Sequence, residues 1–155
     1  MRKITLCLAA TLALGACVRT ATNEATGKVD VDIESPTKRG EDWSATLRGM
    51  GGFAAVSGDA KAMVREGKTE VRVSLIGAQP GGTHPWMVHE GTCAMPGAAV
   101  GDHSAYTPIT IAADGRGTQT ANLNARLDEA KDYIILVHVS PNDMTNIVAC
   151  GDLDD

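Results

Sequence analysis

The sequence predicts an all-β domain, and three observations support this prediction. Hydrophobic residues make up 43% of the 155 residues and charged residues 21%, which is typical of a folded protein. Glycine occurs 17 times while aromatic residues amount to only 3%, a balance that favours a turn-rich β protein over a helical bundle. From Trp43 onward, short stretches alternate apolar and polar residues and are separated by turn-forming residues. We therefore expect an antiparallel sandwich or Greek-key barrel of roughly seven or eight strands.

The first segment of the chain has the pattern of an export signal. Arg2 and Lys3 precede an apolar stretch, residues 4–14, that is too short to cross a bilayer as a helix. The stretch leads into Leu-Gly-Ala-Cys, which resembles a bacterial lipobox. We therefore expect residues 1–16 to be a lipoprotein signal peptide and Cys17 to carry lipid. The alternative is an ordinary secretory signal with small residues before its cleavage site.

The next segment, residues 17–42, is expected to be the lipidated cysteine followed by a flexible polar tether. The alternation of Val29, Val31 and Ile33 within it is compatible with an added edge strand. Val18 follows the cysteine, so no aspartate is present there as an inner-membrane retention signal. The lipoprotein rule then predicts a lipid-anchored protein of the bacterial cell envelope, in the outer membrane and facing the periplasm.

The folded domain is expected to span residues 43–155. Its clearest amphipathic strands are Trp43–Leu47 and Val71–Leu75, and the run Ile134–Val137, apolar on both faces, predicts a central strand. A short helix is expected at residues 125–131. Further strands are expected at residues 60–65, 86–89, 108–112, 119–124, 133–140 and 146–153. Turns are expected at residues 57–59, 66–68, 79–82, 114–115 and 141–143.

Two cysteines remain in the expected mature domain, because Cys7 leaves with the signal peptide and Cys17 carries lipid. In an oxidising compartment, Cys93 and Cys150 predict one disulfide bond. Two buried free thiols are the alternative.

The histidines are the residues that indicate chemistry. The sequence lacks the Gly-x-Ser-x-Gly, His-Glu-x-x-His, Cys-x-x-Cys and phosphate-loop patterns of common active sites. Met87 and His89 are two residues apart and therefore share one face of a strand. Imidazoles combined with a thioether in an oxidising compartment suit copper, especially Cu(I). The alternative for His138, which lies among apolar residues, is a hydrogen-bonded structural histidine.

One segment, residues 80–93, reads PGGTHPWMVHEGTC. It resembles the copper-site segment of the copper/zinc superoxide dismutase family, in which a Pro-Gly turn precedes His-Gly-Phe-His-x-His-Glu and the disulfide cysteine. Three later segments also resemble this family, in the same order along the chain. GDH at 101–103 is similar to the segment of the bridging histidine, and LVHV at 136–139 to the strand of the last copper histidine. VACGDL at 148–153 is similar to the closing strand. The resemblance covers residues 43–155. It implies a superoxide-dismutase-like, eight-stranded Greek-key β-sandwich or barrel, and it supports the Cys93–Cys150 disulfide.

The resemblance assigns roles to the histidines residue by residue. His89 matches the second histidine of the copper pair, His138 the late copper histidine, and His103 the histidine that bridges copper and zinc. Met87 stands where the family has the first histidine of the copper pair, and its soft sulfur favours Cu(I). His84 matches a histidine that supports the structure, and it is also an alternative ligand that could swing into the copper site.

The chain departs from the family at the zinc site and at the substrate guide. No histidine lies between His103 and His138, so both remaining zinc histidines are missing and zinc is not expected. Asp114 lies near the position of the zinc aspartate, but beside Gly115 it is typical of a turn. Ile147 stands where the family has the arginine that attracts superoxide, so we expect weak electrostatic guidance of this anion.

Three functions stay open for this divergent domain, whose active site is incomplete. The first is a copper-only superoxide dismutase without zinc. The second is a periplasmic protein that binds, buffers or hands on Cu(I). The third is a non-catalytic β-sandwich lipoprotein. The expected partners are the membrane, through the lipid on Cys17, and superoxide or a copper ion; the net charge of −5 argues against nucleic acid.

The lipid anchor makes a testable prediction. Cys17→Ser should release the protein from the membrane fraction, because acyl chains and not the polar tether would hold it there. Fractionation of cells that express each form measures this. A variant that stays wholly in the membrane fraction would refute the lipidation.

Overall fold

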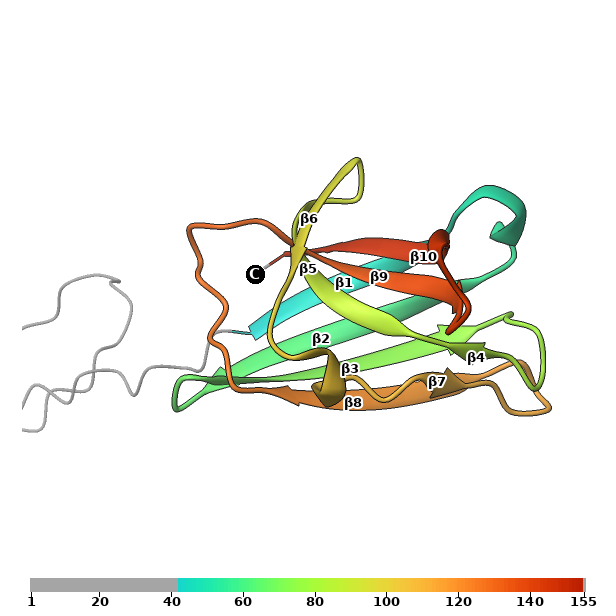
Figure 1. Cartoon of the computed structure of the whole chain (residues 1–155), viewed down its shortest axis with the longest axis horizontal. Coiled ribbons are helices and arrows are strands. Elements are labelled where there is room, and N and C mark those ends of the chain that lie inside the picture. The colour runs from blue at the N-terminus through green and yellow to red at the C-terminus, as the bar shows by residue number, and fades with distance from the viewer. Residues whose placement is uncertain (1–41, 155) are drawn as a thin grey trace, which may run out of the picture. The chain divides into compact units, whose positions relative to one another are not determined.

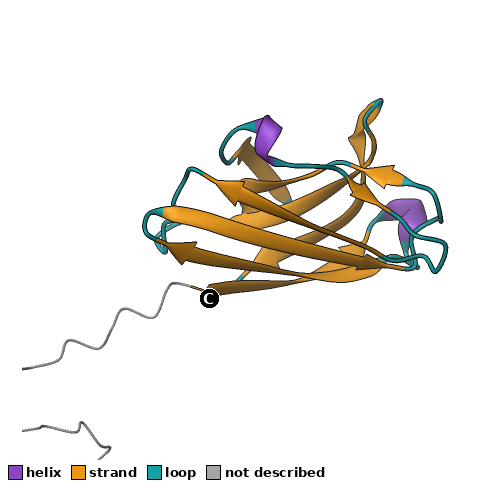
Figure 2. Cartoon of the chain, turned by 90° about the horizontal axis from the view of Figure 1, so that it is seen from below, coloured by secondary structure: helices purple, strands orange, loops and turns teal. Residues whose placement is uncertain are grey.

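The computed structural model describes residues 42–154, in which strands dominate and the helical segments are two 3-10 turns. Eight strands form one antiparallel sheet that curls into a half-barrel (Figure 1, Figure 2). The predicted all-β, eight-stranded fold is confirmed. From one edge to the other the strands are β6 (Met95–Ala99), β5 (Trp86–Thr92), β9 (Tyr133–Ser140), β10 (Asp143–Leu153), β1 (Asp42–Gly49), β2 (Ser57–Arg65), β3 (Lys68–Ile76) and β8 (Gly117–Leu123).

A second, two-stranded sheet connects distant parts of the first one. β4 (Thr83–His84) pairs with β7 (Ile109–Thr110). β4 also contacts β9, and β7 contacts β8, so the small sheet lies between strands that are far apart in the order of the large sheet. The two 3-10 turns are η1 (Gly51–Phe53), after β1, and η2 (His103–Ala105), before β7.

The signal peptide (1–16), Cys17 and the tether, with the proposed edge strand at 29–33, lie outside the described residues, apart from Asp42, which begins β1. Within the described residues, no helix is both long and apolar enough to cross a membrane.

The core lies on the concave side of the sheet, where the predicted alternation places the apolar side chains. Burial removes these side chains from water and supplies the main favourable term in folding. The two clearest predicted strands contribute alternating buried residues: Trp43, Ala45 and Leu47 from β1, and Val71, Val73 and Leu75 from β3.

The central strand β9 is buried on both faces, as the apolar run in its sequence predicts. It lies between β5 and β10. Ile135 and Val137 belong to the main core, whereas Ile134 and Leu136 form a second cluster with Cys150 on the opposite, outer face. The outer face of β9 is therefore also covered, and it carries His138.

The predicted disulfide is present and helps to cover this outer face. Cys93 and Cys150 are bonded, with their Cα atoms 6.0 Å apart. The backbone N–H of Cys93 also donates a 2.9 Å hydrogen bond to Oδ1 of Asp152. These contacts attach the turn between β5 and β6 to the closing strand β10.

The predicted helix at residues 125–131 is wrong, because this segment is irregular. Two of its backbone groups form hydrogen bonds with side chains and not with the backbone of a helix. The carbonyl of Ala125 accepts a 2.7 Å hydrogen bond from the Thr69 hydroxyl, and the N–H of Asp128 donates to the Tyr133 hydroxyl at 3.0 Å. So short a segment has little intrinsic helix stability, and tertiary contacts decide its conformation.

The predicted turn at residues 57–59 is also wrong, because these residues begin β2 and pair with both β1 and β3. Glycine at position 58 permits a close approach, since a Cβ atom there would collide with the carbonyl oxygen of Ser74. Ser-Gly-Asp therefore marks tight strand packing here and not a turn. The strand expected at 108–112 is shortened to Ile109–Thr110.

The disulfide makes a testable prediction about stability. Its cysteines are separated by 57 residues in sequence, so loop entropy predicts that the bond contributes about 4 kcal/mol to the free energy of unfolding. Reduction should lower the melting temperature by on the order of 10 °C. Thermal unfolding of the oxidised and fully reduced protein measures this difference, and equal melting temperatures would contradict it.

Candidate functional site

Two of the four histidines lie near each other on the outer face of the central strands. His89 on β5 is the cross-strand partner of Ile134, and Met87 is the partner of Leu136, so these four side chains share one face. His138 follows Leu136 by two residues on β9 and lies on the same face. The ring centroids of His89 and His138 are 6.4 Å apart.

The hydrogen bonds of His89 leave one ring nitrogen available for a ligand. Its Nδ1 donates to the backbone carbonyl of Gly97 on β6 at 3.0 Å. This contact requires the proton on Nδ1, so Nε2 of the neutral ring carries a lone pair. That Nε2 atom is buried and makes no hydrogen bond of good geometry.

His138 is more completely buried, with 5% of the residue exposed. Neither of its ring nitrogens makes a hydrogen bond of good geometry. Burial lowers the pKa of His138 below its ordinary value; the nearby Met144 backbone opposes this shift, while the neighbouring His89 adds to it. The ring is therefore biased to its neutral form, which is the form that binds metals.

Buried polar atoms without partners are rare and call for an explanation, such as a bound ion. Within residues 42–154, no three His, Cys, Asp or Glu side chains gather into a group that could hold a metal ion. The structure thus brings together His89 and His138. The register of β5 with β9 places Met87, which is 6% exposed, on the same face, while its side chain also packs with the main core.

The structure places the remaining candidate residues elsewhere or in supporting roles. His103 is exposed in η2, at the start of that 3-10 turn. Asp114 is exposed in a turn, where its Oδ1 accepts a 3.1 Å hydrogen bond from the Arg116 N–H. Ile147 is the cross-strand partner of His138, so an apolar side chain lies beside this histidine.

His84 supports the backbone of His138. The N–H of His138 donates to the carbonyl of Pro85 at 2.8 Å. Proline has no backbone N–H, so the carbonyl of His138 receives no hydrogen bond from Pro85 in return. The Nδ1 atom of His84 supplies the missing hydrogen bond, at 3.1 Å from that carbonyl oxygen. This contact favours the supporting role of His84 over that of an alternative ligand.

The sequence did not identify two residues that orient the pair. Gly97 holds His89 through its carbonyl, and a Cβ atom at this position would lie 2.9 Å from the carbonyl oxygen of Glu90. Pro85 fixes the His138 backbone. The Pro between His84 and Trp86 was a visible signal, since a proline at a sheet position leaves one carbonyl without a donor.

No protein-family model matches this chain, and no curated protein matches it either. The superoxide-dismutase-like assignment therefore remains a proposal from the sequence.

The burial of His138 predicts a pH dependence of stability. Because its folded-state pKa lies below the ordinary value of 6.5, the unfolded chain binds a proton that the folded chain does not. The stability from this group is present above about pH 6.5 and is lost as the pH falls towards the folded-state pKa. Denaturant unfolding with a metal chelator, at about pH 7.5 and pH 5.5, measures the loss.

The variant His138→Gln should reduce this loss of stability, while His103→Gln, at an exposed position, serves as the matched control. An unchanged pH dependence in His138→Gln would show that another group is responsible.

Proposed function

We propose that this chain is an envelope lipoprotein whose half-barrel domain is of the copper/zinc superoxide dismutase type and binds copper, with Cu(I) preferred. The observation that supports the proposal is the His89–His138 pair, with its unpartnered, buried ring nitrogens. The lipid anchor and the envelope location are proposed from the sequence around Cys17.

The residues of the pair suit copper in its reduced state. Nε2 of His89 and a ring nitrogen of His138 are neutral imidazole donors, and the thioether of Met87 is a soft donor on the same face. Cu(I) accepts this combination of ligands in low coordination number, and thioethers favour it over Cu(II). Structural zinc sites use four ligands and catalytic sites at least three, and the described residues offer no such group of His, Cys, Asp or Glu.

The surrounding residues would orient the ligands and keep water out. Gly97 holds the tautomer of His89, and the backbone of His138 is fixed by Pro85 and His84. Hydrogen bonds from neighbouring groups set the orientation of metal-binding side chains and the basicity of their donor atoms. Ile147 and the cluster around Leu136 supply an apolar surface, which favours the less charged oxidation state. Copper, when bound, would supply one-electron chemistry or be carried as cargo.

Superoxide dismutation is less well supported than copper binding. The reaction requires the site to use both oxidation states of copper and to attract an anion. Ile147 provides no positive charge next to His138, and the chain carries a net charge of −5. We therefore expect slow superoxide turnover.

Titration of the purified protein with Cu(I), in competition with a chelator, and with Cu(II) tests the proposal. The wild type should bind about one copper ion, with Cu(I) preferred. His138→Ala should lose roughly 100-fold or more in affinity. Met87→Leu keeps the apolar volume but removes the sulfur, so it should weaken Cu(I) binding selectively, and Met87→His should shift the preference towards Cu(II).

The variant His103→Ala is the matched control and should bind copper like the wild type, since His103 is exposed in η2. Absence of binding in both oxidation states would contradict the proposal and favour the non-catalytic lipoprotein. A superoxide assay on the same samples completes the test, because rapid turnover without zinc would show that the domain is an enzyme.

A further inference from the structure

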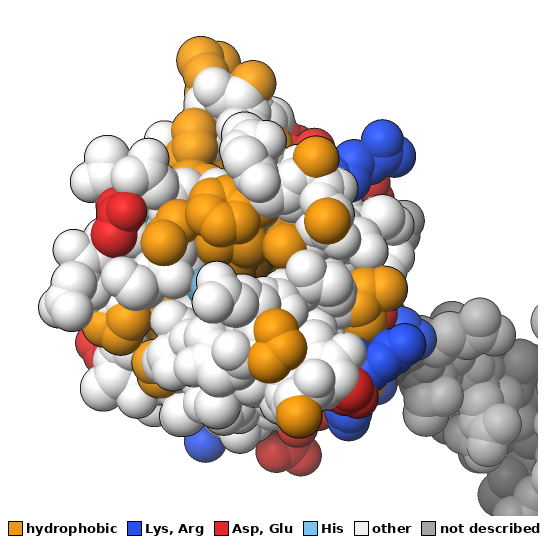
Figure 3. Space-filling view, turned by 90° about the vertical axis from the view of Figure 1, so that its right-hand side faces the viewer, with side chains coloured by type: hydrophobic (Ala, Val, Ile, Leu, Met, Phe, Trp, Pro, Cys, Tyr) orange, Lys and Arg blue, Asp and Glu red, His pale blue; other side chains and the backbone are white. Residues whose placement is uncertain are grey.

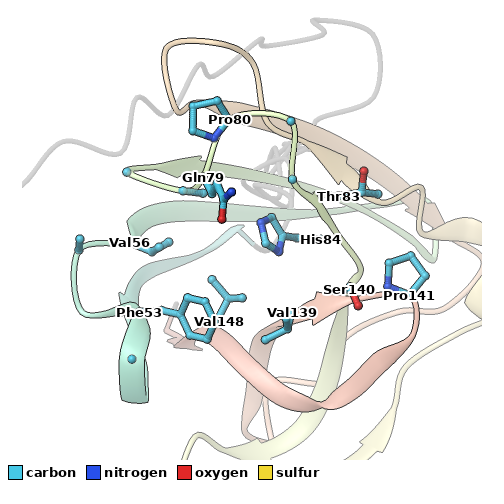
Figure 4. Close-up of a pocket in the computed structure, with 16 residues that line it drawn as sticks. Phe53, Val56, Gln79, Pro80, Thr83, His84, Val139, Ser140, Pro141 and Val148 are labelled. Atoms are coloured by element: carbon cyan, nitrogen blue, oxygen red, sulfur yellow. The ribbon is translucent and has the colours of Figure 1, made fainter.

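A separate pocket, of about 600 Å³, opens at the end of the half-barrel where η1, the β3–β4 loop and the β9–β10 turn meet (Figure 4). Figure 3 shows this end of the domain, with apolar side chains gathered around a hollow. The volume lies within the range of small-molecule sites. We propose that this pocket binds a small uncharged molecule that has an apolar body and one hydroxyl group. This inference is independent of copper.

The lining of the pocket determines which molecules it would accept. Its walls are mainly apolar, formed by Phe53, Val56, Pro80, Val139, Pro141 and Val148. No Lys, Arg, Asp or Glu is among the described residues that line it. A charged ligand would therefore be buried without a counter-charge, which is unfavourable. The side chains of Gln79, Thr83 and Ser140 add uncharged polar groups.

One buried polar atom gives the pocket a specific recognition group. His84 is only 8% exposed and lies in the middle of the labelled lining residues in Figure 4. Its Nδ1 donates to the carbonyl of His138, so its Nε2 carries a lone pair, and this atom has no hydrogen-bond partner. The atom can therefore accept a hydrogen bond, and a hydroxyl group supplies a donor without adding charge.

Glycine at position 82 allows the backbone of the β3–β4 loop to pack directly against this atom. A Cβ atom at Gly82 would lie 2.8 Å from Nε2 of His84, closer than a side chain tolerates. Gly82 thus covers the ring edge with backbone alone. A ligand hydroxyl would reach Nε2 by a small displacement of the turn of residues 79–82, whose Gly82 N–H donates to the Gln79 carbonyl.

Two matched probes test the proposal on the purified protein without copper. The phenol 4-propylphenol has a hydroxyl donor, whereas its methyl ether, 4-propylanisole, has the same apolar body and no donor. We expect the phenol to bind about tenfold more tightly, since the ether leaves Nε2 unpaired. Nuclear magnetic resonance should show the His84 ring signals shifting with the phenol and much less with the ether. Equal affinities, or an unchanged His84 signal, would overturn the role of His84.

Two variants test the location. Phe53→Ala removes an apolar wall of the pocket and should weaken phenol binding about tenfold. Met50→Ala is the matched control, because Met50 is an exposed apolar residue in the same segment that does not line this pocket. Absence of phenol binding by the wild type, or equal binding by Phe53→Ala and the wild type, would overturn the pocket as the binding site. Either outcome leaves the proposed copper binding untouched, because copper titration of the same samples tests it separately.

Discussion

The burial of β9 on both faces is the constraint on which the other features of the domain depend. Ile135 and Val137 pack into the concave core, while Ile134 and Leu136 need cover on the outer face. The disulfide supplies part of that cover, because it attaches the turn after β5 to β10 beside these residues. The stretch of β9 from Tyr133 to His138 is covered on both sides and excludes water. Any polar side chain on it is then removed from water as well.

This constraint distinguishes two interpretations of the His89–His138 pair. A structural histidine on a buried strand normally uses its ring nitrogens in hydrogen bonds. His89 does so with Nδ1 only, and His138 makes no hydrogen bond of good geometry with either nitrogen, although the Met144 backbone is close enough to raise its pKa. Leaving these atoms unpaired costs free energy on the order of a kcal/mol or more for each. The pair therefore presents buried nitrogen atoms with unpaired lone pairs, and the proposal of copper binding rests on this feature.

The features predictable from sequence were those that depend on local alternation and on cysteine count. Alternating residues in β1 and β3, and the continuous apolar run in β9, identified strands because burial follows the two-residue period. Features set by distant contacts were missed or misread. The Ser57–Asp59 stretch resembled a turn, yet close packing against Ser74 makes it a strand. Residues 125–131 have helical spacing, but Thr69 and Tyr133 hold their backbone in another conformation.

In the candidate site, too, local sequence patterns predicted some features, while contacts between distant residues decided the others. Strand periodicity placed Met87 on one face with His89, and His138, which lies among apolar residues in the sequence, is buried. Which histidines meet depends on the register of β5 with β9, which neither strand specifies alone. Gly97 takes part only through its carbonyl, and an individual backbone group leaves no signal in residue type.

A single residue without an N–H group links the two regions of the domain. Because Pro85 cannot donate to the carbonyl of His138, that carbonyl takes its hydrogen bond from Nδ1 of His84. The bond holds the backbone that carries His138, and it also requires the His84 proton to be on Nδ1. The lone pair of His84 is consequently on Nε2, on the side of the apolar pocket. The recognition chemistry of the pocket thus follows from the need to satisfy one carbonyl group of the central strand.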